Sequence, residues 1–120
     1  MNDLDSLYSK ANELFYNGEN ERAMLYFDEY VKQNPSNEVM WNNRAVVLSN
    51  LKRFDEALSS YDEAIRAKPY EPENYCNKGF TLEGMGRFDD ALIWYNKALE
   101  IKPNDEHYIK LKTNLLKRTK

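Results

Sequence analysis

Hydrophobic and polar residues follow one another along the chain with the period of an α-helix, in short segments that turns interrupt. In the first segment the apolar residues stand three and four positions apart, on one helical face; they are Leu4, Leu7, Tyr8, Ala11, Leu14 and Phe15. The same spacing returns in segments that begin near residues 21, 38, 54, 72, 88 and 105. The pattern therefore predicts an all-α chain of seven amphipathic helices.

The ends of these helices are marked by residues that cap or break a helix. Asp3 stands directly before the first apolar segment, where an N-cap residue belongs. Gly18 and Gly86 interrupt the pattern where two helices must be joined by a tight turn. Proline ends every second helix, because the residue before a proline avoids the helical conformation; the three prolines are Pro35, Pro69 and Pro103. The helices are thus predicted to come in pairs.

These marks recur with a period of 34 residues, as the three prolines show. Alanines keep the same interval at Ala23, Ala57 and Ala91, and so do the aromatic residues Phe27, Tyr61 and Tyr95. A fixed period of this size indicates a repeat architecture in which each pair of helices is one unit. The repeats are predicted at about residues 4–37, 38–71 and 72–105, and a half-polar helix over about residues 105–118 is predicted to cap the array.

The chain resembles the tetratricopeptide repeat family. The family pattern has a large residue at repeat position 4 and a small one at position 8, met here by Leu7, Trp41 and Tyr75 and by Ala11, Ala45 and Gly79. It has alanine at position 20 and proline at position 32, met by the alanines and prolines above. The resemblance covers nearly the whole chain. It implies a right-handed α-solenoid of three repeats plus a C-terminal capping helix, forming a single domain over residues 1–120.

Two features depart from the common family pattern. Position 7 is commonly leucine but here holds Lys10, Arg44 and Lys78, which is similar to prokaryotic-type variants of the family. Tyr30 stands where the pattern has a second alanine, so we expect looser packing or a different angle in the first repeat.

The resemblance also implies a function: the first helices of the repeats line a concave groove that binds a peptide or a partner segment. Carried onto this sequence, the groove residues are Tyr8, Asn12, Phe15, Val39, Asn42, Asn43, Val46, Glu73, Cys76, Asn77 and Phe80. Aromatic side chains offer apolar contact, and asparagine amides both donate and accept hydrogen bonds, which suits the backbone of an extended peptide. The alternative is that several of these asparagines are ordinary surface residues.

Some family members hold the C-terminal carboxylate of a chaperone in a clamp of lysine, arginine and asparagine. Asn12 and Asn43 match that clamp, but Tyr8, Glu73 and Asn77 stand where it needs cations. A carboxylate requires charged donors to offset its desolvation, so we do not expect this clamp here. The resemblance also places Asp5 and Glu83 at groove positions, and together with Glu73 these acidic groups indicate instead a ligand with basic or neutral side chains.

Charge is distributed unevenly along the chain. The net charge of −3 is too small to favour nucleic acid as a partner. Residues 1–30 contain seven acidic and two basic residues, whereas the last stretch holds Lys110, Lys112, Lys117, Arg118 and Lys120. An alternative function is therefore self-assembly into a homo-oligomer through the surfaces of the terminal repeat and the cap helix. The plainer interpretation is a solvated cap helix.

Residues suited to catalysis are scarce, so we predict a scaffold for protein–protein interaction rather than an enzyme. His107 and Cys76 are the only residues of their kinds, which leaves no cluster for a metal site and no cofactor motif. No apolar run approaches the length of a membrane helix, and the first residues lack the order of a signal peptide. A single cysteine cannot form an internal disulfide, and we expect a cytoplasmic protein.

Overall fold

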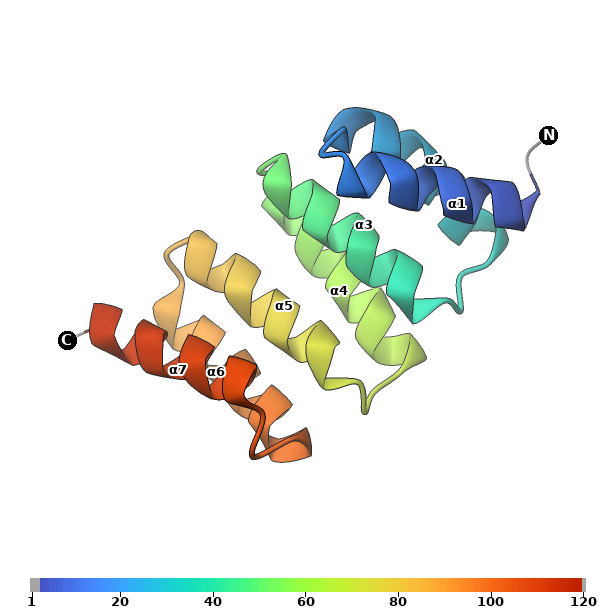
Figure 1. Cartoon of the computed structure of the whole chain (residues 1–120). Helices are drawn as coiled ribbons and strands as arrows, with labels where there is room; N and C mark the ends of the chain where they lie inside the picture. Colours follow the sequence, from blue (N-terminus) through green and yellow to red (C-terminus); the bar gives the residue numbers. More distant parts are fainter. Residues whose placement is uncertain (1–2, 120) are drawn as a thin grey trace. The chain divides into compact units, whose positions relative to one another are not determined.

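The computed structural model describes residues 3–119, and within that range it consists of seven helices joined by short turns, with no strand (Figure 1). The helices are α1 (Leu4–Tyr16), α2 (Asn20–Gln33), α3 (Glu38–Asn50), α4 (Phe54–Ala67), α5 (Pro72–Gly84), α6 (Phe88–Ile101) and α7 (Glu106–Arg118). The all-α class and the helix boundaries predicted from the repeat period are confirmed.

The chain divides into two compact units. The first unit, Met1–Lys68, contains α1 to α4, and the second unit, Pro69–Lys120, contains α5 to α7. In the first unit α2 packs against both α1 and α3, and α3 packs against α4. In the second unit α6 packs against both α5 and α7. The first unit thus contains two helix pairs, and the second unit contains one helix pair and α7.

Side chains cap the N-termini of three helices: α1 and α3, which are each the first helix of a pair, and α7. The Asp3 carboxylate accepts a hydrogen bond of 2.8 Å from the backbone N–H of Ser6, as the sequence predicts, and this bond lowers the pKa of Asp3. Asn37 caps α3 through Met40 N–H at 3.3 Å, and Asp105 caps α7 through Tyr108 N–H. These caps fix where the helices α1, α3 and α7 begin.

The turns inside the three helix pairs share one backbone geometry. Gly18, Lys52 and Gly86 occupy equivalent repeat positions, with φ values of 75°, 60° and 81°. In each turn the next N–H bonds at 2.9 Å to a carbonyl five residues back, which closes the end of the first helix. Glycine adopts this left-handed conformation without a penalty, whereas a lysine does not. The turn residue of the second repeat was not predicted.

The core of the first unit is formed by apolar residues from all four of its helices, among them Leu14, Phe27, Met40 and Leu48. Tyr30 belongs to the same core with only 5% of its surface exposed, and its hydroxyl accepts hydrogen bonds from the side-chain amides of Asn34 and Asn37. The expected looser packing is therefore not found at this side chain. The Tyr30 side chain is packed within the core, and its hydroxyl is hydrogen-bonded.

In the second unit α7 is held on α5 by two contacts near its opposite ends. The Tyr108 hydroxyl donates to Glu73 Oε2 at 2.9 Å, and Arg118 Nη1 pairs with Glu83 Oε2. The guanidinium of Arg118 also lies 4.8 Å from the centre of the Phe88 ring. Arg118 lies on the solvated face of the cap helix, as the sequence predicts, but its guanidinium also pairs with Glu83, a contact that was not predicted.

The cations at repeat position 7 have specific partners that explain why leucine is absent there. Arg44 Nε donates to Asp28 Oδ1 at 2.8 Å, and Arg44 Nη1 donates to the Ser60 hydroxyl. In the second unit the Lys78 ammonium lies 3.8 Å from the centre of the Trp94 ring, a cation–π contact. These side chains join helices through charge rather than through apolar contact.

Candidate functional site

Two parallel stripes of groove candidates face one another in the first unit. On α1 the stripe consists of Tyr8, Asn12 and Phe15, and on α3 it consists of Val39, Asn43 and Val46. Both follow the spacing i, i+4, i+7, so each stripe lies along one face of its helix. The α1 and α3 helices run in the same direction (Figure 1).

The two stripes meet at their central asparagines. Asn43 Nδ2 donates a hydrogen bond of 3.2 Å to Asn12 Oδ1, and both side chains are half-buried. This bond uses the acceptor of Asn12 and one donor hydrogen of Asn43. The Nδ2 group of Asn12 and the Oδ1 atom of Asn43 therefore form an adjacent donor and acceptor, the complement of a peptide unit.

Apolar side chains lie one turn before and one turn after this asparagine pair. Before it, Tyr8 is 38% exposed and Val39 is 42% exposed. After it, Phe15 and Val46 are half-buried. The Tyr8 ring is fixed from below by an edge contact with Tyr30, with ring centres 6.0 Å apart. The surface is thus a polar centre between two apolar patches.

In the second unit the corresponding stripe on α5 consists of Glu73, Asn77 and Phe80, again at i, i+4 and i+7. Phe80 is 60% exposed, a large aromatic surface that nothing in the core of the unit requires. Asn77 is half-buried, and the Glu73 carboxylate accepts the Tyr108 hydroxyl. Asn42, the remaining groove candidate on α3, is also half-buried.

Cys76 was expected to belong to the groove, but it has only 1% of its surface exposed. Burial, followed by the charges of Glu73 and Asp105, raises the pKa of Cys76 to about 12. The thiol therefore stays protonated near neutral pH and is neither a surface contact nor a nucleophile.

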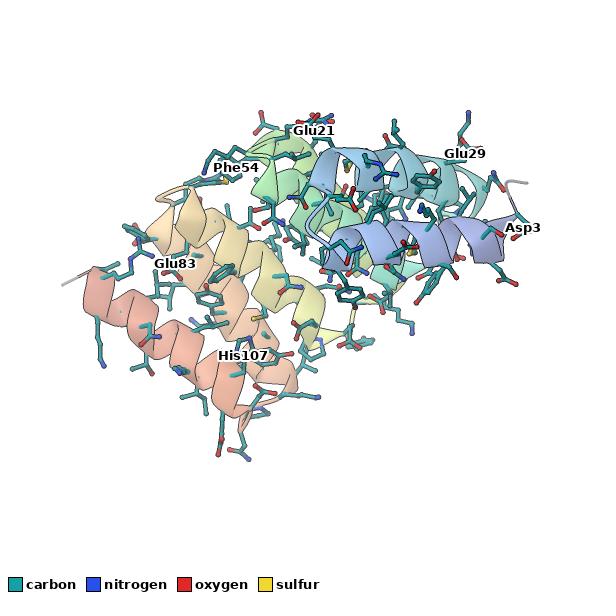
Figure 2. All side chains as sticks on the ribbon, turned by 45° about the horizontal axis from the view of Figure 1, so that its top comes forward. Asp3, Glu21, Glu29, Phe54, Glu83 and His107 are labelled. Atoms are coloured by element: carbon teal, nitrogen blue, oxygen red, sulfur yellow. The ribbon has the colours of Figure 1, made fainter. Side chains whose placement is uncertain are left out.

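The acidic groups expected to select a basic ligand are largely engaged within the protein. Glu83 is buried, accepts the Tyr95 hydroxyl at 2.8 Å and pairs with Arg118, so it offers no surface charge (Figure 2). Glu73 is exposed but is bonded to Tyr108. Only Asp5 remains of the three, which weakens the sequence argument for a basic ligand.

Metal-ligating side chains do not gather in the described part of the chain. His107 is exposed in the first turn of α7 (Figure 2). Residues 3–119 contain no group of three or more histidine, cysteine, aspartate or glutamate side chains placed to bind a metal ion. In the same range, none of the helices has the length and apolar character needed to cross a membrane.

Comparison with protein families identifies the class of these repeats. Residues 8–72 match one tetratricopeptide repeat model and residues 72–105 match a second one. The chain belongs to the tetratricopeptide repeat family, which confirms the resemblance seen in the sequence.

Curated relatives match over part of their length only. The chain is 40% identical over 50 residues to stress-induced-phosphoprotein 1 of Caenorhabditis elegans. It is 35% identical over 51 residues to Hsp70-Hsp90 organizing protein 3 of Arabidopsis thaliana. Each alignment covers 42% of this chain, but only 16% and 9% of the two relatives.

Solved structures with the same fold cover nearly the whole chain. The first repeat domain of Spaghetti (RPAP3), bound to the HSP90 peptide SRMEEVD, superposes with a TM-score of 0.87 at 22% identity, covering 97% of this chain and 92% of that one. The repeat domain of Arabidopsis OM64 gives 0.88 at 21% identity, covering 96% and 95%. The crystal structure of MamA gives 0.90 at 16% identity, covering 98% and 69%. These matches confirm the predicted fold class, an α-solenoid of tetratricopeptide repeats.

Family and fold together support a protein–protein interaction module, as predicted from the sequence.

Proposed function

We propose that this chain is a non-catalytic binding module that holds an extended segment of a partner protein along the first helices of its repeats. The observation that carries the proposal is the asparagine pair of Asn12 and Asn43, placed between apolar patches in the first unit. An extended peptide exposes one N–H and one C=O per residue and alternates its side chains, so it matches a polar centre with apolar pockets on both sides.

The α5 stripe offers a surface of the same kind in the second unit. Val39, Asn43 and Val46 stand at the same repeat positions as Glu73, Asn77 and Phe80, so the α5 stripe also offers an amide and a large aromatic ring. Phe80 serves as the apolar anchor, because burying an exposed aromatic side chain contributes strongly to binding.

The ligand that this surface selects need not end in a carboxylate. The Spaghetti domain binds a peptide with the sequence SRMEEVD. In this chain Tyr8, Glu73 and Asn77 stand at the positions where a carboxylate clamp places cations. We infer that internal segments with neutral and apolar side chains are preferred over an acidic C-terminus.

The proposal is tested by selecting ligands from a phage library of random peptides and measuring the affinity of the selected peptide by fluorescence anisotropy. Tyr8→Ala, Asn43→Ala and Phe80→Ala are each expected to weaken binding at least about tenfold, as loss of an interface anchor does. Ile93→Ala removes an exposed apolar side chain from α6 and is the matched control, with unchanged affinity expected. Equal affinity in all four variants would place the ligand elsewhere and overturn the proposal.

A second measurement addresses the clamp directly. SRMEEVD with a free C-terminus and the same peptide with an amidated C-terminus are compared on the unaltered chain. We expect neither to bind more tightly than the other, because Tyr8, Glu73 and Asn77 stand where the clamp places its cations. Tight binding that amidation abolishes would show that a clamp exists in spite of Tyr8 and Glu73.

A further inference from the structure

The outward face of α7 carries an apolar strip bordered by lysines. Ile109 and Leu116 stand seven residues apart on one face and are 43% and 42% exposed. In the first two repeats the residues that correspond to Leu116 are Leu14 and Leu48, and both are fully buried. Lys110 and Lys117 lie beside the strip and are exposed, and no acidic residue occurs between Ile109 and Leu116.

The outward face of α1 and α2 carries a hollow lined by acidic residues, whereas the α7 strip is bordered by lysines. A cavity of about 580 Å³ is lined by Asp5, Ser6, Leu7, Ser9, Lys10, Glu13 and Tyr26. A neighbouring one of about 330 Å³ is lined by Leu7, Leu25, Tyr26 and Glu29, and Leu25 is 70% exposed. Because the two cavities share Leu7 and Tyr26, they form one depression, lined by the apolar or aromatic residues Leu7, Leu25 and Tyr26 together with polar and acidic residues.

The second repeat indicates what kind of element such a hollow receives. Lys10 in the hollow corresponds by repeat position to Arg44, and Tyr26 corresponds to Ser60. Arg44 is contacted by Asp28 from α2, the second helix of the preceding repeat, and by Ser60. In the second repeat, α2 lies beside Arg44. The hollow beside Lys10 is the equivalent position in the first repeat, so a helix is the element that would fit there.

The charges of the hollow favour a basic helix. Lys10 lies 3.7 Å from Glu13, and Arg22, near the exposed Leu25, pairs with Glu19. With both local cations matched to acids, the additional carboxylates at Asp5 and Glu29 leave this surface negative. A helix that offers apolar side chains flanked by lysines complements it in both respects.

We propose that the occupant is a second copy of this chain, whose α7 docks its strip of Ile109 and Leu116 into the hollow between α1 and α2. The contact joins two different surfaces, so each pair of molecules keeps one hollow and one α7 strip available for further copies. This assembly does not use the stripes proposed to bind a peptide, neither those on α1 and α3 nor the one on α5. Its small apolar area and exposed charges make it weak and dependent on salt.

The first test is the mass of the unaltered chain by light scattering over a dilution series, at low and at high salt. We expect the mass to rise above one chain as concentration increases, and to fall back when salt is raised from about 0.1 M to about 1 M, since screening shortens the reach of the charges. A mass of one chain at every concentration at low salt would mean that the α7 strip does not bind a second copy, and it would overturn the proposal.

The second test distinguishes a head-to-tail contact from any symmetric one. Lys110→Glu combined with Lys117→Glu reverses the charge beside the strip, and Leu25→Asp places a charge in the hollow. Each variant alone is expected to remain a single chain, because one of its two surfaces is blocked. Mixed in equal amounts, they are expected to form a two-chain species and nothing larger. Association of either variant alone, or a mixture that stays single, would overturn the proposal.

Matched controls separate the contact from a general effect of charge. Ile93→Asp makes the same kind of change as Leu25→Asp at the same repeat position on α6. Lys52→Glu combined with Lys68→Glu changes the net charge as much as the α7 variant does, at two other exposed lysines. Both controls should associate as the unaltered chain does. Loss of association in them would attribute the effect to net charge and would contradict the docking contact.

Discussion

Gly79 of α5 lies directly against the ring of Tyr95 of α6. A Cβ atom placed on Gly79 would stand 2.8 Å from Cδ1 and 2.9 Å from Cε1 of that ring, and 3.2 Å from the carbonyl oxygen of Ala91. The ring is fully buried and its hydroxyl is bonded to Glu83, so it has little freedom to move away. The glycine is what allows these two helices to approach so closely.

Gly79→Ala is therefore expected to destabilise the chain by about 1–2 kcal/mol, because overpacking outweighs the better helix propensity of alanine. The free energy of unfolding in urea measures this. Gly84→Ala is the control, since a Cβ at Gly84 meets no atom within 4 Å. That variant should be as stable as the unaltered chain or slightly more stable. Equal stability of the two variants would contradict the close contact.

Tyr30 departs from the family pattern, and the structure indicates that restoring the pattern is harmful here. Tyr30→Ala is expected to cost about 3–5 kcal/mol, because it opens a cavity in the core of the first unit. Tyr30→Phe should cost only about 1 kcal/mol, for the loss of the hydroxyl that accepts from Asn34 and Asn37. Thermal unfolding of both variants checks the order. A Tyr30→Ala variant with full stability would mean that the alanine of the pattern fits this core after all.

Lys52 adopts a left-handed backbone conformation, and the equivalent residues in the other two repeats, Gly18 and Gly86, are glycines. Lys52→Gly is expected to stabilise the chain by up to about 1 kcal/mol, since it removes the strain of a side chain at positive φ. Lys68→Gly, at an exposed lysine with φ −140°, should destabilise slightly or have no effect. A rise in the urea midpoint for Lys52→Gly alone supports the interpretation, and a fall in both variants contradicts it.

The features predictable from the sequence are those that repeat with the period. Pro35, Pro69 and Pro103 predicted that the helices come in pairs, and the structure has those pairs. Ala23, Ala57 and Ala91 recur with the same period, and all three are fully buried. Such residues act within one turn or one repeat, so their effect is visible in a local pattern. The candidate asparagines at Asn12 and Asn43 were found in the same way, from their repeat positions.

The contacts that were missed join residues far apart in the sequence. The bonds from Tyr108 to Glu73 and from Arg118 to Glu83 each span 35 residues, and no local pattern distinguishes them from solvated charges. Burial of Cys76 was missed for a related reason: its neighbours along α5 are polar or exposed, such as Asn77 and Phe80. Helix packing, rather than the residues adjacent in sequence, determines which side of α5 is covered.

Alkaline pH should destabilise the chain, because buried groups retain their protons in the folded state. Burial raises the pKa of Cys76 to about 12, and burial followed by a hydrogen bond to a glutamate raises the pKa of Tyr95 and of Tyr108. In the unfolded chain a cysteine loses its proton near pH 8.5 and a tyrosine near pH 10, each before the folded chain does. Stability is therefore fully present below about pH 8.5 and declines as pH rises.

By pH 10, Cys76 alone is expected to account for a loss of about 1–2 kcal/mol. Urea unfolding at pH 8, 9 and 10 measures the decline. Cys76→Ala should lose clearly less free energy of unfolding over this range than the unaltered chain, because only the onset of the titration of Tyr95 and Tyr108 remains in it. A decline of the same slope in Cys76→Ala would assign it to other groups.

A single domain over residues 1–120, as the sequence predicts, requires the two compact units to unfold together. Each unit contains one tryptophan, Trp41 in α3 and Trp94 in α6, so Trp94→Phe leaves a reporter in the first unit and Trp41→Phe leaves one in the second. Within each variant the urea midpoint from fluorescence is expected to coincide with the midpoint from far-ultraviolet circular dichroism, which follows both units. Comparing the two signals inside one variant removes the effect of the substitution itself, such as the lost bond from Trp41 to the Pro35 carbonyl. Separate midpoints would mean that the repeats unfold as two units whose mutual coupling is weaker than their internal cohesion.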